Sequence, residues 1–408
     1  MHVIRLPRAV AGLAILLPFC ALAQVPATNV PQPTLHAMVE SAWQRSPLAR
    51  TLAARQDETA AGKELAGSWL ASAPSVGLSQ RSDRWTDQRD RRESEISLSA
   101  SVWLPGQRAR RSDLADAGGA ELDAQSHQLR LEIAGQVRDR LWEVASAREV
   151  AAEKEDHWQH LQELAQDVER RVAAGDLPRS DGLMAQQEVI SAQMALSSAR
   201  RDARTALARF ALLTGMQTAP VPEIEPLPPT EAAVPVRLQA AQAAERRARA
   251  AVAAATAQPT SAPTIALSMR RERDGLLAPS DRSIGVSLQI PLVGKMRNRP
   301  AETAAATQLG AASAELAMTQ ALVDADIELA RSRLRDAEEG VALAETRAES
   351  ILEHTRLFQQ AFALGERSLA ELLRSRVQSH EAQIALRQQR NALGRAHADF
   401  NQALGIIP

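Results

Sequence analysis

Two histidines have the spacing that comes closest to a metal site. His157 and His160 lie three positions apart in a long stretch without proline, and side chains three apart share one face of a helix. Imidazoles bind transition metals, but a zinc site takes at least three protein ligands, and no third ligand is evident beside this pair. We therefore interpret both histidines as part of a solvated helix face, and we expect neither a bound metal nor a cofactor.

The rest of the sequence offers little that could carry out catalysis. It lacks a phosphate-binding loop, a serine-hydrolase elbow and the zinc-protease motif. Its 49 acidic residues are interspersed with 48 basic ones, a pattern typical of surface ion pairs and not of catalytic carboxylate pairs. The net charge of −1 disfavours nucleic-acid binding. We expect a protein that is not an enzyme, and we keep a secreted enzyme as a less favoured alternative.

The N-terminal segment, residues 1–23, has the features of a signal peptide. Arg5 and Arg8 precede the apolar run 9–19, which is too short to span a bilayer, and residues 21–23 form an Ala-x-Ala cleavage site. The single cysteine, Cys20, follows a bulky phenylalanine, which disfavours lipid acylation. We predict that the mature chain starts at Gln24 and leaves the cytoplasm without a lipid anchor.

The chain after this segment contains an internal repeat of two copies. Residues 24–217 form one copy and residues 236–408 the other, and the six prolines of residues 218–235 make the connector between them extended. We expect one body with internal pseudo-symmetry, in preference to two independent domains. Landmarks recur in the same order at offsets of 188 to 190 positions: Pro74 and Pro263, Gly106 and Gly294, Gly175 and Gly365, Gly215 and Gly405.

Each copy has the pattern helix, strand, strand, long helix, shorter helix. The fold class is therefore mainly α with a small β part, in which long antiparallel coiled-coil hairpins dominate. In the first copy we expect the first helix over 48–71, strands over about 74–104 and a helical hairpin over about 107–214. The corresponding ranges in the second copy are 237–257, about 263–292 and about 295–404.

The strands alternate apolar residues with small polar ones. Ile96, Leu98 and Val102 alternate with serines, and Ile284, Val286 and Leu288 alternate with glycine, serine and glutamine. This pattern fits a sheet packed on a core, or a barrel wall between lipid and water. Four strands cannot close a barrel and open edges are not tolerated in lipid, so a barrel requires three chains and about twelve strands. The charged segments 82–95 and 271–282 are expected to be aqueous loops.

The long helices, over 107–174 and 295–363, are each about 65–70 residues, or about 100 Å. Gly175 and Gly365 are predicted to end them, and Ser180 or Ser368 to cap the return helices, over about 181–213 and 369–403. The first helix of each copy is expected to stack end to end with its return helix. Apolar seams on the return helices include Leu183, Ile190, Met194, Leu207 and Phe210, then Leu373, Val377, Ile384, Leu393 and Phe400.

With this duplicated order, the mature chain resembles the TolC-like outer-membrane factor family. Residues 174–183 resemble the hairpin tip of the CzcC-like heavy-metal branch, and residues 290–299 resemble the strand-to-helix junction of that branch. The resemblance implies a homotrimer in the cell outer membrane that extends into the periplasm. In that family three chains share a twelve-stranded β-barrel and build a periplasmic α-barrel.

The resemblance also implies a role and partners. The chain is expected to be the outer-membrane channel of a tripartite, RND-type efflux pump, a passive exit duct for substrates such as heavy-metal cations. A periplasmic adaptor, bound to an inner-membrane transporter, is expected to dock on the hairpin tips, while outer-membrane lipid surrounds the barrel. The main alternative is a periplasmic coiled-coil structural or adaptor protein without a membrane barrel, since aromatic residues are scarce near the strands.

The two tips are the site that the resemblance assigns. Acidic residues at the start of a helix match the helix dipole, which is a sufficient structural reason for Asp181 and Glu371; a ring of either around the pore is a further hypothesis. The first tip comprises Val172, Gly175, Asp176, Leu177, Ser180 and Asp181, and the second comprises Phe362, Gly365, Glu366, Arg367, Leu369 and Glu371.

Overall fold

The two copies fold into closely similar series of elements. The computed structural model describes residues 33–83, 91–228, 234–258, 262–275, 278–291 and 295–408, so the predicted signal peptide and part of the 290–299 junction lie outside the described residues. The first copy contains α1 (Leu35–Arg45), α2 (Pro47–Gly67), β1 (Ser75–Ser82), β2 (Arg91–Ser101), α3 (Gln107–Ala174) and α4 (Arg179–Thr214). The second contains α5 (Val236–Ala257), β3 (Thr264–Asp274), β4 (Ser280–Gln289), α6 (Lys295–Ala363) and α7 (Leu369–Ala403).

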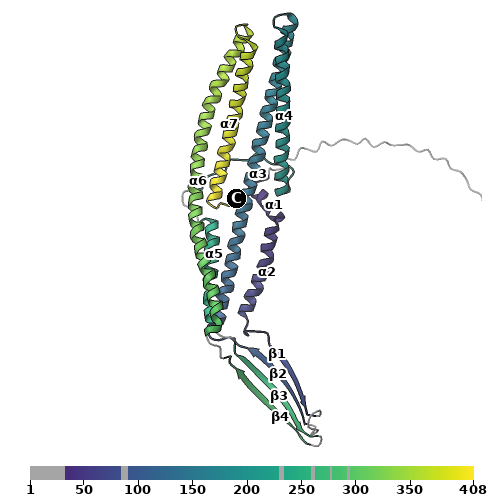
Figure 1. The fold of residues 1–408 in the computed structure, drawn as a ribbon, viewed down its shortest axis with the longest axis vertical. Helices are drawn as coiled ribbons and strands as arrows, with labels where there is room; N and C mark the ends of the chain where they lie inside the picture. Colours follow the sequence, from purple (N-terminus) through teal and green to yellow (C-terminus); the bar gives the residue numbers. More distant parts are fainter. Residues whose placement is uncertain (1–32, 84–90, 229–233, 259–261, 276–277, 292–294) are drawn as a thin grey trace, which may run out of the picture. The chain divides into compact units, whose positions relative to one another are not determined.

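The helices lie side by side in rows of four (Figure 1). Near the hairpin turns the contacts run in the order α4, α3, α7, α6, and towards the sheet they run in the order α2, α3, α5, α6. The contact between α3 and α7 joins the two copies, and residues 34–408 form one compact unit. In the described part of the chain, no helix has the length and apolarity needed to cross a bilayer.

The predicted stacking of a first helix on its return helix is seen in the second copy, whereas in the first copy α1 contacts the end of α4 in place of α2. The Ser41 hydroxyl in α1 donates a 2.6 Å hydrogen bond to the Thr214 carbonyl at the end of α4. In the second copy, Gly405 lies against the backbone of Pro235 and Val236, where α5 begins. The sequence had not predicted α1 as a separate helix.

The first helix of the first copy differs from the prediction at its C-terminal end. It was expected over 48–71, but α2 ends at Gly67. Leu70 instead pairs with Val102 in an isolated antiparallel bridge, and Ser68 accepts a 3.0 Å hydrogen bond from the Trp103 indole. The last residues of the expected helix therefore belong to the junction with the sheet.

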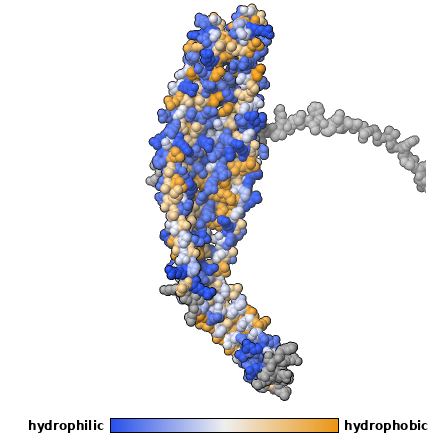
Figure 2. Space-filling view, in the orientation of Figure 1, coloured by the Kyte–Doolittle hydropathy of each residue, from blue (hydrophilic) through white to orange (hydrophobic). Residues whose placement is uncertain are grey.

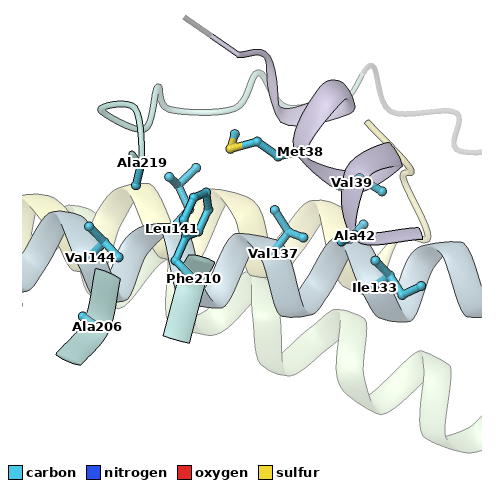
Figure 3. Close-up of a cluster of buried hydrophobic side chains, with 11 residues drawn as sticks. Met38, Val39, Ala42, Ile133, Val137, Leu141, Val144, Ala206, Phe210 and Ala219 are labelled. Atoms are coloured by element: carbon cyan, nitrogen blue, oxygen red, sulfur yellow. The ribbon is translucent and has the colours of Figure 1, made fainter. Parts of the chain in front are cut away.

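One core cluster lies where α1, α3, α4 and the connector meet (Figure 3). Phe210 of α4 and Val137 of α3 are fully buried there, and Met38 of α1 covers them. Ala219 brings the start of the connector into the same cluster. Burying such side chains contributes about 1.5–3 kcal/mol each, so this cluster fixes the first copy at the level where its short helix and return helix stack.

The buried face of α4 matches the predicted seam only towards its C-terminal end, where Leu207 and Phe210 pack inward. Leu183, Ile190 and Met194 are 58–65% exposed, so they do not pack against α3. The buried positions are mainly alanines at intervals of seven residues, and because alanine has a small side chain, it lets two helix backbones approach closely. These alanines are Ala185, Ala192, Ala199 and Ala206.

A buried ion pair holds the connector against the helices. Arg138 of α3 donates to both carboxylate oxygens of Glu225, at 2.8 and 2.7 Å, and also to Gln402 and the Ile406 carbonyl. Its side chain is 4% exposed. A guanidinium suits this place because its planar group offers several donors in fixed directions. The sequence had suggested that the charged residues form surface ion pairs. This buried pair is an exception, and it links α3, the connector and the C-terminal end of α7.

The four strands form one antiparallel sheet in the order β1-β2-β3-β4. Their register places Leu78, Ile96, Met269 and Ile284 in one row, and Leu98, Leu267 and Val286 in another. These side chains are 48–79% exposed, so in a single chain this face has no protein core behind it. The small polar residues Ser97 and Ser268 are paired on the opposite face.

The strands are longer than predicted, because they continue into the charged segments that were expected to be loops. β2 begins at Arg91 and β3 ends at Asp274, and these two residues form a 2.7 Å ion pair across the strands. Opposite charges on neighbouring strands stabilise a sheet, which explains why the pairing extends this far. Figure 2 shows the resulting hydrophilic patch near the loop end of the sheet.

Candidate functional site

The first hairpin tip is closed by a left-handed glycine. Gly175 has φ = 86°, and the Asp176 amide donates a 2.9 Å hydrogen bond to the Arg171 carbonyl, which gives the Schellman ending of α3. The next helix begins at Arg179 with Pro178 as its N-cap residue. The prediction that Ser180 caps this helix was therefore wrong: it already lies inside the first turn, because Pro178 occupies the preceding cap position.

The second tip has the same glycine ending and a complete cap. Gly365 has φ = 77°, and the Glu366 amide donates to the Ala361 carbonyl at 2.9 Å. Ser368 caps α7, as predicted, and forms a capping box with Glu371. Hydrogen bonds donated by the backbone and side chain of Ser368, with a smaller contribution from Arg367, lower the pKa of the Glu371 carboxyl.

The two tips adjoin each other. The guanidinium of Arg171 lies 5.1 Å from the ring centroid of Phe362, and Val172 and Leu177 of the first tip pack against a cluster that contains Phe362 and Leu369 of the second. The structure therefore brings together the apolar residues of the predicted site beneath the turns. The exposed ends are polar or glycine, namely Gly175, Asp176, Ser180, Gly365, Glu366 and Arg367, while Asp181 and Glu371 are half-buried.

His157 and His160 lie deeper in the hairpins than the tips. His157 of α3 stacks on His380 of α7, with ring centroids 3.9 Å apart and 11° between the planes. The interpretation of a solvated helix face is wrong for His157 and holds for His160, which is exposed. The reason is that the partner histidine comes from the other copy, more than 200 residues away.

Both ring nitrogens of His380 have hydrogen-bond partners. Lys154 lies 3.0 Å from Nε2 and can only donate, so Nε2 accepts and Nδ1 carries the proton. Nδ1 then donates to Glu153 at 3.1 Å, and Glu153 also pairs with Arg387 at 3.2 Å. The hydrogen bond from His380 lowers the pKa of Glu153, although burial opposes it. Burial, followed by the repulsive neighbour His380, lowers the pKa of His157 from 6.5 to about 4.

This cluster does not have the ligand set of a metal site. Both nitrogens of His380 are used by Lys154 and Glu153, and the described residues contain no group of three or more His, Cys, Asp or Glu side chains that could hold a metal ion. The arrangement is chemically a buried polar contact between the two hairpins.

An outward stripe along α6 was missed in the sequence. Leu322, Leu329, Leu343 and Leu357 are 42–64% exposed, and Leu364 continues the stripe just beyond the helix. Their spacing is a strict multiple of seven, which is the signal that could have revealed a second coiled-coil seam. The inward side of this helix includes Val323 and Leu334, which are buried.

Solved structures with this architecture are bacterial outer-membrane proteins. VceC from Vibrio cholerae is 18% identical, with a TM-score of 0.72, over 91% of this chain and 96% of that one. The outer-membrane channel CmeC from Campylobacter jejuni is 14% identical, with a TM-score of 0.73, over 91% and 85%. The chain has the fold of bacterial outer-membrane channels. The channel fold is seen again in CusC, at 14% identity and a TM-score of 0.75 over 92% of each chain.

The channel fold is the level of likeness that these matches establish, because the identities are below 20%. No family model matches the sequence, and no curated protein matches it. The fold accounts for the paired helical hairpins and the four-stranded sheet in one chain, as the resemblance implied.

Proposed function

We propose that the chain is the outer-membrane exit duct of a tripartite, RND-type efflux pump. The observation that carries the proposal is the sheet, whose large apolar side chains are exposed on one face although they have no core to cover. Within the described residues its outer strands, β1 and β4, each have one neighbour. Such a sheet is stable in lipid only when neighbouring chains close it.

Three copies supply the required closure. Four strands from each chain give a barrel of twelve, with the apolar face towards outer-membrane lipid and the serine-rich face towards water. Each row of four helices likewise becomes a ring of twelve, which forms the periplasmic α-barrel. A cyclic arrangement brings α4 of one chain next to α6 of another, because these two helices end the row.

The exposed stripes of α4 and α6 support this contact. Leu183 of α4 lies four residues from the start of its helix, and Leu357 of the α6 stripe lies six from the end, so apolar side chains of both stripes occur at similar depths below the tips. The helices run in opposite directions along the hairpins, as an antiparallel coiled coil requires.

The tips are the part that we propose meets the other pump components. Their exposed turns present Asp176, Glu366 and Arg367 above a buried apolar base. A periplasmic adaptor contacts them and in turn binds an inner-membrane transporter. Because the transporter selects the cargo, the duct needs only a wide polar lumen and no catalytic group; metal cations as cargo rest on the resemblance of residues 174–183 to the heavy-metal branch.

The proposed function is tested by extracting the full-length protein from cell membranes and measuring the ion conductance of the purified protein. We expect a trimer in the detergent-extracted outer membrane and stepwise ion conductance after reconstitution into planar bilayers. Recovery as a soluble periplasmic monomer would favour the alternative of a coiled-coil structural or adaptor protein. A deletion strain challenged with metals, drugs and detergents then identifies the class of cargo.

Asp181 is the better candidate for an acid that lines the pore. Its carboxylate has only a 3.5 Å contact with Ser180 among the described residues, whereas Glu371 is held by its own capping box. We expect Asp181→Asn to reduce cation preference in reversal-potential measurements, and Glu371→Gln to leave it unchanged. If Asp181→Asn and the wild-type protein have the same cation selectivity, Asp181 does not line the pore.

A further inference from the structure

Arginines collect on one face of the sheet near its loop end. The register pairs Arg271 with Arg282 and with Ser94, and Arg273 with Arg92 and Ser280. All these positions have the same parity as Ile96, Met269 and Ile284, so they lie on the apolar face. The strand residues of this face at its loop end are arginine, serine and glutamine, and the face carries no acidic strand residue there.

The acids of the same strand ends lie on the other face. Glu93, Glu95, Glu272, Asp274 and Asp281 have the opposite parity in the register. Arginines on that face pair with them: Arg270 with Glu93 at 2.9 Å, Arg91 with Asp274 at 2.7 Å, and Arg81 with Glu93 at 3.8 Å. The arginines of the polar face are therefore all paired with acids, while the apolar face has an excess of positive charge.

The arginines follow directly on the apolar band. The band runs from Ile290, just after β4, to Ile284 within it, about 20 Å at roughly 3.3 Å per residue. The Arg271 and Arg282 row is the next one outward. A hollow of about 620 Å³ lies at this boundary, and its lining includes Ile96, Met269, Arg271 and Arg282. Apolar and cationic groups thus meet at one level on one face.

We propose that Arg271, Arg273 and Arg282 bind the phosphate groups of outer-leaflet lipid headgroups. The inference rests on the proposed function, because it requires the apolar face to be in the membrane with the loop end outward. Guanidinium groups bind phosphate oxygens through two parallel hydrogen bonds, and they are less strongly hydrated than ammonium groups. All three side chains are exposed in the single chain, and their long stems reach along the band to the headgroup level.

This placement gives the arginines a positional role. In the trimer, the three arginine patches lie around the rim of the barrel. Phosphorylated lipids bound to them surround the barrel and fix how deeply it sits in the outer leaflet. An apolar band of this height is short for a bilayer, and anchoring at its edge offsets the mismatch. The lumen-facing arginines cannot substitute, because acids on their own face already pair with them.

The test measures binding of a diphosphorylated lipid A to the purified trimer in non-ionic detergent. The variant Arg271→Gln/Arg273→Gln/Arg282→Gln is compared with Arg81→Gln/Arg91→Gln/Arg270→Gln, which removes the same charge from the same strand ends on the opposite face. Each surface arginine contributes roughly fivefold in affinity, so the first variant should bind on the order of 100-fold more weakly. The second should stay within about threefold, and added salt should weaken wild-type binding.

A lysine variant and competition measurements complete the test. A triple lysine variant at 271, 273 and 282 should recover much of the affinity, and dephosphorylated lipid A or inorganic phosphate should not compete. Equal losses in both glutamine variants, or no loss in the first, would overturn the proposal while the trimer and its conductance remain intact. A chain that forms no membrane-inserted trimer would overturn both this proposal and the proposed function.

Discussion

At the scale of single residues, the stacked histidines are the polar contact most sensitive to its surroundings. The charged and titratable neighbours of His157 are Glu153 and Lys154 on its own helix and Arg376 and His380 on α7. Burial and the nearby positive groups disfavour a proton on His157, so its pKa falls to about 4. The folded chain therefore holds this imidazole neutral, whereas the unfolded chain protonates it near pH 6.5.

The first prediction is that acid weakens the fold through His157. As the pH falls from 7 to 5, His157 binds a proton in the unfolded state but stays neutral in the folded state. The free energy of unfolding therefore decreases by roughly 2 kcal/mol. Glu153 adds little in this window, since its lowered pKa matters only below about pH 4.5. Chemical unfolding of the purified protein at the two pH values measures the change.

Matched variants separate this effect from general acid sensitivity. His157→Gln should remove most of the decrease between pH 7 and pH 5, while His160→Gln, on the exposed side of the same helix, should retain it. A wild-type protein equally stable at both pH values would contradict the assignment.

At the scale of elements, the contact between α3 and α7 decides how the two hairpins meet. Gly394 of α7 lies against the ring of Trp142, a buried side chain of α3, and a methyl group added at Gly394 would overlap that ring. Helices joined in this way cannot shift apart without exposing the indole. The close approach thus depends on one glycine and one tryptophan from different copies.

We predict that Gly394→Ala destabilises the protein by roughly 1–3 kcal/mol, because the added methyl group displaces the Trp142 ring. Gly310→Ala is the control: it adds the same group within α6, where nothing lies within 4 Å, and it should stabilise the helix by about 0.5–1 kcal/mol. Denaturant midpoints of both variants test the pair. Equal effects of the two substitutions would show that Trp142 does not restrict this contact.

At the scale of the whole molecule, the exposed surface of the single chain is what requires an assembly. The leucine stripe of α6, the outward stripe of α4 and the apolar face of the sheet are all uncovered. Water-soluble monomers rarely expose apolar surface of this extent. The proposed trimer covers all three surfaces, two with neighbouring chains and one with lipid.

The prediction at this scale concerns Leu357. Leu357→Glu places a charge in each interface of the proposed trimer and should cost on the order of 2–3 kcal/mol per interface. Light scattering in detergent should then show monomers at concentrations where the wild type is trimeric. Leu352→Glu is the comparison, because Leu352 is 55% exposed against 52% for Leu357 but lies outside the seven-residue spacing of the stripe. Dissociation of both variants alike would argue against a specific seam.

Much of the architecture was predictable because its signals are local. The glycines at 175 and 365 end the long helices, since a positive φ suits glycine, and alternating residues placed the strands. The constant offset between copies predicted the duplication. The tip residues came from the resemblance, and Ser180 did not cap α4, because Pro178 determined where that helix begins.

What the sequence by itself determined is therefore the set of elements, their order and the faces of the strands, all of which depend on neighbouring residues. Only the tertiary structure decided which helix faces meet. It turned the alanines of α4 inward and Leu183, Ile190 and Met194 outward, and it paired His157 with His380 from the other copy. The physical reason is that such contacts join residues far apart in the chain, where packing of whole helices outweighs the preference of any single side chain.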